Sequence, residues 1–183
     1  IGQARIAYSI AEKRMDITNF SLHTDYQSII ANGTASELAT DSIDVVLNNI
    51  NLDYLLSYTE ASKAISIMGP VTGQAQVYSV FSAPMLEAQA QIRNGGLNGV
   101  YLGDVTAEAR LDRENKTILI EGEAIDSTGH RVAEVTGKVI PATKWWGLDI
   151  SCDSVDISFI DFWTKDIIAN PQGRGYGHVK VEG

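Results

Sequence analysis

Three histidines and one cysteine are the residues best suited to catalysis or metal binding, and their positions argue against both. His23, His130 and His178 fall in turns or on polar faces of expected strands, without the spacing of a metal site. Cys152 is the only cysteine, which excludes an internal disulfide, and it alternates with Leu148 and Ile150 like a small buried side chain. No Gly-x-Ser-x-Gly elbow offers a nucleophile. We expect no metal and no cofactor.

Paired carboxylates are the remaining candidates for chemistry. Asp149 and Asp153 share the polar face of an expected strand, as do Glu121 and Glu123. Two such carboxylates are the acid and base of many glycosidases, and clustered carboxylates bind calcium. Pairs of this kind also arise by chance in a chain whose formal net charge is -9. The sequence therefore predicts a protein that is not an enzyme.

Composition narrows the class of partner. The chain has 183 residues, of which 44% are hydrophobic, so it can bury a core. Its acidic balance, without a basic patch, argues against nucleic acid as a partner. No apolar run is long enough to span a bilayer. Because the chain begins at Ile1 rather than at Met, we expect an internal fragment whose membrane anchor and export signal lie elsewhere.

The elements that position these residues are strands, because the dominant hydrophobic period is two. The runs 87–93, 105–112 and 131–140 alternate apolar with polar residues, and turn signals stand at 93–96, 112–116 and 126–130. This pattern predicts antiparallel hairpins with one apolar face and one solvated face. Helical spacing is present only in 50–62 and 155–168, which predicts short crossover helices packed on the sheet.

An internal repeat organises the chain. Residues 43–58 and 148–163 agree in polar and apolar class at an offset of 105, and Gly69 and Gly73 match Gly173 and Gly177 at an offset of 104. The repeat predicts the end of a first module at 1–42, a complete module at 43–147 and the start of a further module at 148–183. All three are expected to form one continuous sheet, in which the glycine that precedes each repeated strand supplies a positive φ or a close approach of the backbone.

The apolar face of such a sheet has to be covered, either by its own second layer or by a ligand. A closed sandwich would be filled with large side chains, whereas this face is rich in alanine, which favours an open trough. The residues predicted to line the trough are Ala75, Val77, Ala88, Ala90, Ile92, Val105, Ala107, Ala109, Leu111, Ala133, Val135, Val139, Leu148 and Ile150.

Several segments together resemble the TamB and AsmA-like family. They are GPVTGQAQV (69–77), the hairpin pair around YLGDVTAEARLDRENKTILIEGEA (101–124), the strand end GKVIP (137–141) and VDISFIDFW (155–163). The likeness extends from about residue 43 to the end of the chain. It implies a U-shaped antiparallel sheet, the β-taco, in a long periplasmic protein that is anchored to the inner membrane. It also implies a role in lipid transport and outer-membrane biogenesis, in a translocation and assembly module, with no catalytic residue to carry over.

Three functional hypotheses follow. The first is a non-enzymatic trough that binds or conducts phospholipid or another acyl-chain lipid, with an outer-membrane β-barrel partner contacted through parts outside this chain. The second is a scaffold or chaperone that binds client strands by β-augmentation. The third is a closed β-sandwich adhesin or carbohydrate-binding module. Trp145 and Trp146 stand either at a lip that grips a lipid or in a packed hairpin corner.

Overall fold

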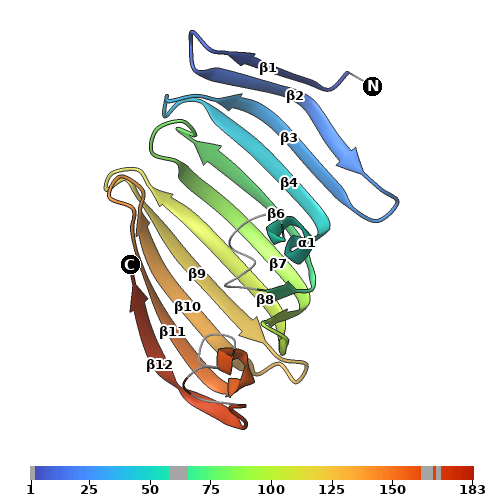
Figure 1. Ribbon diagram of the computed structural model, residues 1–183, viewed down its shortest axis with the longest axis vertical. Coiled ribbons are helices and arrows are strands. Elements are labelled where there is room, and N and C mark those ends of the chain that lie inside the picture. The colour runs from blue at the N-terminus through green and yellow to red at the C-terminus, as the bar shows by residue number, and fades with distance from the viewer. Residues whose placement is uncertain (1–2, 58–65, 162–166, 168–169) are drawn as a thin grey trace.

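The computed structural model describes residues 3–57, 66–161, 167 and 170–183. These residues form one antiparallel sheet, open and elongated, in which every strand after the first lies beside its predecessor in the chain except around β5 (Figure 1). The expectation of an all-β, curled sheet is confirmed. The strands are β1 (Arg5–Ser9), β2 (Arg14–His23), β3 (Ser28–Ala35), β4 (Ser42–Asn51), β5 (Ile67–Met68), β6 (Pro70–Tyr78), β7 (Met85–Leu97), β8 (Val100–Asp112), β9 (Thr117–Ile125), β10 (Arg131–Ile140), β11 (Trp145–Asp156) and β12 (Arg174–Glu182).

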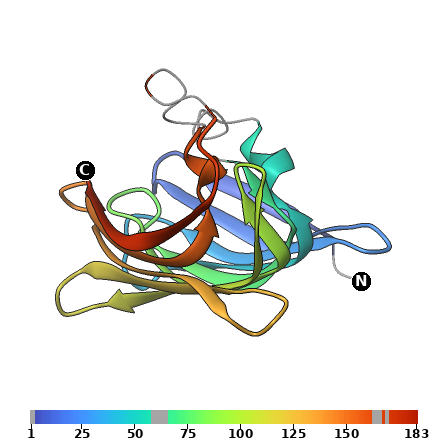
Figure 2. The same ribbon diagram turned by 90° about the horizontal axis from the view of Figure 1, so that it is seen from below.

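Two short helical segments interrupt the series of strands. The α-helix α1 (Leu52–Leu56) follows β4, and the 3₁₀ helix η2 (Ile157–Ile160) follows β11. Both lie on the same side of the curled sheet (Figure 2). They begin within the predicted ranges 50–62 and 155–168, of which residues 58–62, 162–166 and 168 lie outside the described part. Asp156 caps η2 by accepting a hydrogen bond from the Ser158 amide at 2.9 Å.

One expected turn is instead part of a strand. Residues 93–96 were predicted to form a turn, but β7 continues to Leu97, and the chain turns at Asn98 and Gly99, both with positive φ. Asn94 has a φ of 50° and forms a β-bulge, and its amide donates to Asp104 Oδ1 at 3.0 Å. Asn-Gly suits a bulge as well as a turn, because both require a left-handed backbone. The local sequence therefore left these two structures undecided.

The order of the strands has a period of six along the sheet. Strands β2, β3, β4 and β6 begin 103 or 104 residues before β9, β10, β11 and β12 respectively. Asn49 and Ser154 occupy equivalent bulges with φ of 57° and 64°. Gly69 and Gly173, which precede the equivalent strands β6 and β12, have φ of 95° and 114° and confirm the expected positive φ. The shared geometry supports the repeat, while the module boundaries at 1–42, 43–147 and 148–183 stay predictions.

Burial in this sheet is sparse. No large side chain in the described residues is fully buried, and the most buried apolar residues include Ala35 at 0%, Val71 at 2% and Ala124 at 3% exposure. The chain exposes 11895 Å². A compact monomer of this length would expose about 8,600 Å². An open sheet, over which the described residues form no second layer, accounts for the excess.

Replacing Gly103 by alanine should destabilise the fold more than the same change at Gly129. Both have positive φ, of 105° and 84°, but a Cβ at Gly103 would overlap the Ile125 carbonyl oxygen, while one at Gly129 meets nothing within 4 Å. Backbone strain alone predicts about 1–2 kcal/mol at Gly129, and overlap adds at least about 1 kcal/mol at Gly103. Urea unfolding of both variants measures the difference, and equal losses would contradict it.

The pairing of β11 with β12 should weaken in acid. Hydrogen bonds from Lys180, 3.1 Å away, and from His178 hold the pKa of Asp149 below its ordinary value of 3.8. Because the folded state favours the carboxylate, this stabilisation is present above the unfolded pKa and is lost as pH falls through the folded one. Asp149→Asn should therefore lower the melting temperature at pH 7, with a difference that shrinks as the pH falls below 3.8 and through the lowered pKa of the folded state. Melting curves between pH 7 and 2.5 test this, and a constant difference would contradict it.

Candidate functional site

The strand register brings all fourteen predicted trough residues to one face of the sheet. Ala75 pairs with Ala88, which pairs with Ala109 on its other side, and Ala90 pairs with Ala107. The same parity continues through β9 and β10 to β11, where Val135 faces Ile150. Ile157 of η2 lies against this face beside Gly175. The face is therefore the side of the sheet that carries the helical segments.

This apolar face is covered at both ends of the strands and open between them. At the end near the helices, Val71 and Ala124 are 2% and 3% exposed, and at the far end Ile118 is 7% exposed. None of the fourteen predicted residues is buried: thirteen are half-buried, and Ala107 is exposed. No second layer of described residues covers the middle of the strands.

The open middle consists of small residues. Two neighbouring register rows cross β6, β7, β8 and β9, and rows of larger apolar side chains flank them, among them Ile92 and Val105 on one side and Val77 and Leu111 on the other. Seven of the eight residues in these two rows are alanine or glycine, and the eighth is Ile120 of β9. We call the seven the small-residue strip; its members are Gly73, Ala75, Ala88, Ala90, Ala107, Ala109 and Gly122.

Sequence reasoning missed part of this face. Gly73 and Gly122 belong to the strip, and Leu86 and Ile118 to the flanking row, but none was predicted. The alternation within GQAQV and EGEA carried the signal for the glycines, since each glycine stands at an apolar position of its strand. Glycine has no side chain to reveal which face it occupies.

The strip has no hydrogen-bonding side chain. Its flanks extend to Cys152, which packs with Ala124, Val132 and Val155 in the small core beside η2. Burial raises the pKa of the Cys152 thiol, so it remains protonated and unreactive at neutral pH. The face can therefore bind an apolar group and offers no chemistry of its own.

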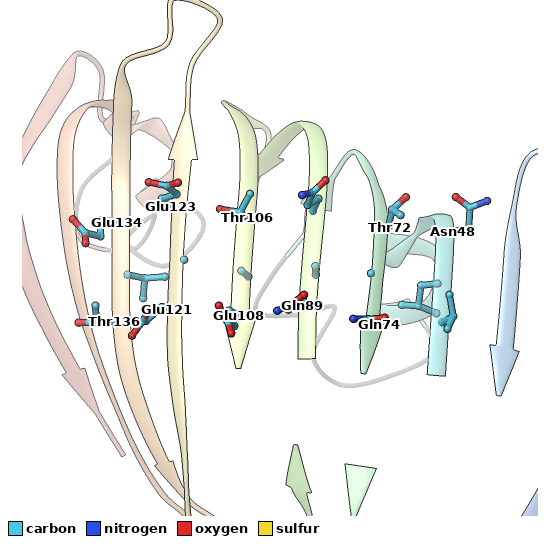
Figure 3. A pocket seen from close by; sticks show the side chains of 18 of the residues that line it. Asn48, Thr72, Gln74, Gln89, Thr106, Glu108, Glu121, Glu123, Glu134 and Thr136 are labelled. Atoms are coloured by element: carbon cyan, nitrogen blue, oxygen red, sulfur yellow. The ribbon is translucent and has the colours of Figure 1, made fainter. Parts of the chain in front are cut away.

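The opposite face carries the predicted carboxylates. Two rows of outward polar side chains border a shallow hollow of about 1070 Å³ that crosses β4 to β10 (Figure 3). Glu121 and Glu123 lie there, together with Glu108 and Glu134, which sequence reasoning did not single out. Glu121 pairs with Arg110, and Glu134 with Arg131 at 3.1 Å. Of the predicted trough residues, Ala90, Ala107 and Val135 border this hollow from the row between.

Two of the three histidines contact carboxylates on the surface, whereas His23 Nδ1 lies 3.3 Å from the Ser21 hydroxyl. His130 Nε2 lies 3.2 Å from Asp153 Oδ2, and His178 Nε2 contacts Asp149. Asp149 and Asp153 therefore share a face as predicted but contact different histidines. In the part of the chain that the structure describes, no group of three or more His, Cys, Asp or Glu residues could hold a metal ion.

The two tryptophans are partly exposed rather than packed in a corner, and they face opposite sides of the sheet. Trp145 and Trp146 begin β11 and are 37% and 38% exposed. Trp146 pairs with Val139 and so faces the apolar side, whereas Trp145 faces the polar side. The backbone of Trp146 exchanges two hydrogen bonds of 3.0 Å with Gly183.

Enlarging a residue of the open strip should cost little stability. Ala107→Leu adds volume at an exposed position that no described residue covers, so we expect a change within about 0.5 kcal/mol. Ala124→Leu makes the same addition inside the small core and should destabilise by about 1–3 kcal/mol. Urea unfolding compares the pair, and a similar loss in both would indicate that the strip is closed.

Among the described residues, none forms a helix long and apolar enough to cross a membrane. Comparisons with protein-family models, curated proteins and solved structures gave no match to this chain.

Proposed function

We propose that this protein is a non-enzymatic β trough that binds acyl chains of phospholipid, or of a similar lipid, on its small-residue strip. The observation that carries the proposal is the exposure of the apolar face: all fourteen predicted residues share it, and none is buried. Exposed apolar surface of this extent on one face marks a binding site in soluble proteins. The ligand that matches it is apolar along its length.

A hydrocarbon chain fits the strip for two physical reasons. It has no polar atom that would lose hydrogen bonds on a face without polar side chains, and the alanines and glycines leave room for its methylenes. Each buried methylene contributes about 0.8 kcal/mol. The alanines and glycines of successive strands offer a hydrocarbon chain similar contacts. A bound chain can therefore move along the strip without being held at one site of much lower free energy.

The cellular setting is proposed on the resemblance to the TamB and AsmA-like family. In that setting the protein acts in the periplasm, as part of a chain anchored to the inner membrane, and contributes to lipid transport during outer-membrane biogenesis. Contact with an outer-membrane β-barrel partner would use parts outside these residues. The closed sandwich is the least suitable alternative, because the sheet is open.

Lipid recovery from the purified protein tests this function. Mass spectrometry of organic extracts should find phospholipid with the parent protein and at least tenfold less with the double variant Ala107→Asp and Ala109→Asp, which places two charges on the strip. The matched control is Gln91→Asp and Thr106→Asp, which places two charges on the opposite face and should keep the lipid.

Circular dichroism of each variant establishes that it folds. If the parent carries no lipid and also fails to take up phospholipid from vesicles, the function is wrong. Equal recovery from folded strip and control variants would likewise overturn it, because the strip would not be the binding face.

A further inference from the structure

The small-residue strip is longer across the strands than along them. Along each strand it holds at most two residues of the apolar face, which lie about 6.8 Å apart. Across the sheet it extends over four strands, β6 to β9, which at about 4.8 Å for each strand amounts to roughly 19 Å. An extended hydrocarbon chain therefore fits the strip with its long axis perpendicular to the strands.

Larger side chains end the strip at β9. Ile120 is half-buried and faces Ala109 of β8, so it ends one of the two rows. The other row continues from Ala107 to Gly122, but there Val135 of β10 leans over the glycine: its Cγ1 lies 3.1 Å from the position that a Cβ on Gly122 would take. Both rows of small residues therefore end at this strand.

The opposite end of the strip is also bounded by larger side chains. On β4, Val45 faces Ala75 and Leu47 faces Gly73, and both of these larger residues are half-buried. A chain bound on the strip therefore lies between the side chains of β4 and those of β9. The strip is a depression with two ends rather than a part of one continuous groove.

The apolar face does not become open again directly beyond Ile120. On its other side Ile120 faces Gly137 of β10, but Leu148 of β11 covers that glycine. The Cδ2 atom of Leu148 lies 2.5 Å from the position that a Cβ on Gly137 would take. Ile120 and Leu148 together form a barrier of two large side chains, which we call the wall.

The repeat contains an equivalent of the wall. At the corresponding positions, 103 to 105 residues earlier, Ile17 of β2 faces Gly33 of β3, and Gly33 faces Ile43 of β4. In both copies a glycine is flanked by two large apolar side chains at the same place in the sheet. The apolar face is therefore divided into compartments, of which the small-residue strip is one.

We propose that Ile120 limits the length of the hydrocarbon chain that the strip binds, so that a longer chain gains nothing from its additional methylenes. Strands β4 and β9 are four strand spacings apart, or roughly 19 Å (Figure 1). The side chains at both ends occupy part of this length. About 12 carbons then fit, because tetrahedral carbons joined by bonds of about 1.5 Å advance roughly 1.3 Å each. The inference rests on the proposed function, since it concerns the specificity of the same face.

Fatty acids of graded length are the probe. Saturated fatty acids of about 8 to about 20 carbons compete with a fluorescent fatty acid for the parent protein, each below its critical micelle concentration. Each methylene that finds room on the strip strengthens binding, so Kd should fall about fourfold per added carbon. Beyond about 12 carbons we expect Kd to stay constant.

Two variants shift this limit in opposite directions. Ile120→Ala opens β9 as far as Leu148, one strand spacing further, so the limit should rise by about four carbons. Ala109→Ile places a large side chain on β8, one spacing earlier, and the limit should fall by about four carbons. A β-branched side chain suits a strand, so Ala109→Ile makes the test even if Ile120→Ala does not fold.

The matched control removes the same type of side chain from beside the strip. Ile92 is half-buried in the row that flanks the strip on β7. Ile92→Ala should raise Kd for all chain lengths without moving the limit, because it widens the depression and does not lengthen it. Circular dichroism establishes that each variant folds.

The outcomes separate this inference from the proposed function. A parent protein that binds no fatty acid of any length overturns both. If the parent binds ever more tightly up to the longest chain, Ile120 sets no limit and the proposed function stands. The same conclusion follows if the limit stays at one length in the folded Ile120→Ala and Ala109→Ile variants.

Discussion

The antiparallel ladder is the interaction on which the rest of this structure depends. Few large side chains are buried, so the continuous backbone hydrogen bonding from β1 to β12 holds the fold together where other proteins rely on a packed core. The register also decides function, because side chains alternate with a period of two. A shift of one residue in one strand would move its alanines to the outer face and replace them by glutamines and glutamates.

The bulges reconcile this regular pairing with a curved sheet. Asn19, Asn49 and Asn94 adopt positive φ within strands, and each amide is bonded by a side chain of the neighbouring strand: Asn32, Thr72 and Asp104. A bulge increases local twist and bends the strand. These bulges recur toward the ends of the strands that lie near the helical segments. Such bending agrees with the curl of the sheet that Figure 2 shows. The side-chain partners satisfy amides that leave the ladder.

The two faces meet different physical demands. On the polar face, which carries the hollow, charged side chains form exposed ion pairs such as Arg131 with Glu134. Each such pair contributes little to stability. On the inner face, the sheet leaves apolar surface in contact with solvent, which costs free energy unless a ligand covers it. This contrast makes the small-residue strip, rather than the acidic hollow, the stronger candidate for the functional site.

The sequence by itself determined the class of fold, the antiparallel hairpins and the shared face of all fourteen predicted residues, because alternation is a local property that survives folding. It also located the two crossover segments and the positive φ of Gly69 and Gly173. Tertiary structure alone decided whether 93–96 would turn or bulge, since pairing with β8 makes that choice. It alone showed that Gly73 and Gly122 lie beside the alanines of neighbouring strands and that no second layer of described residues covers the strip, because both depend on which strands become neighbours.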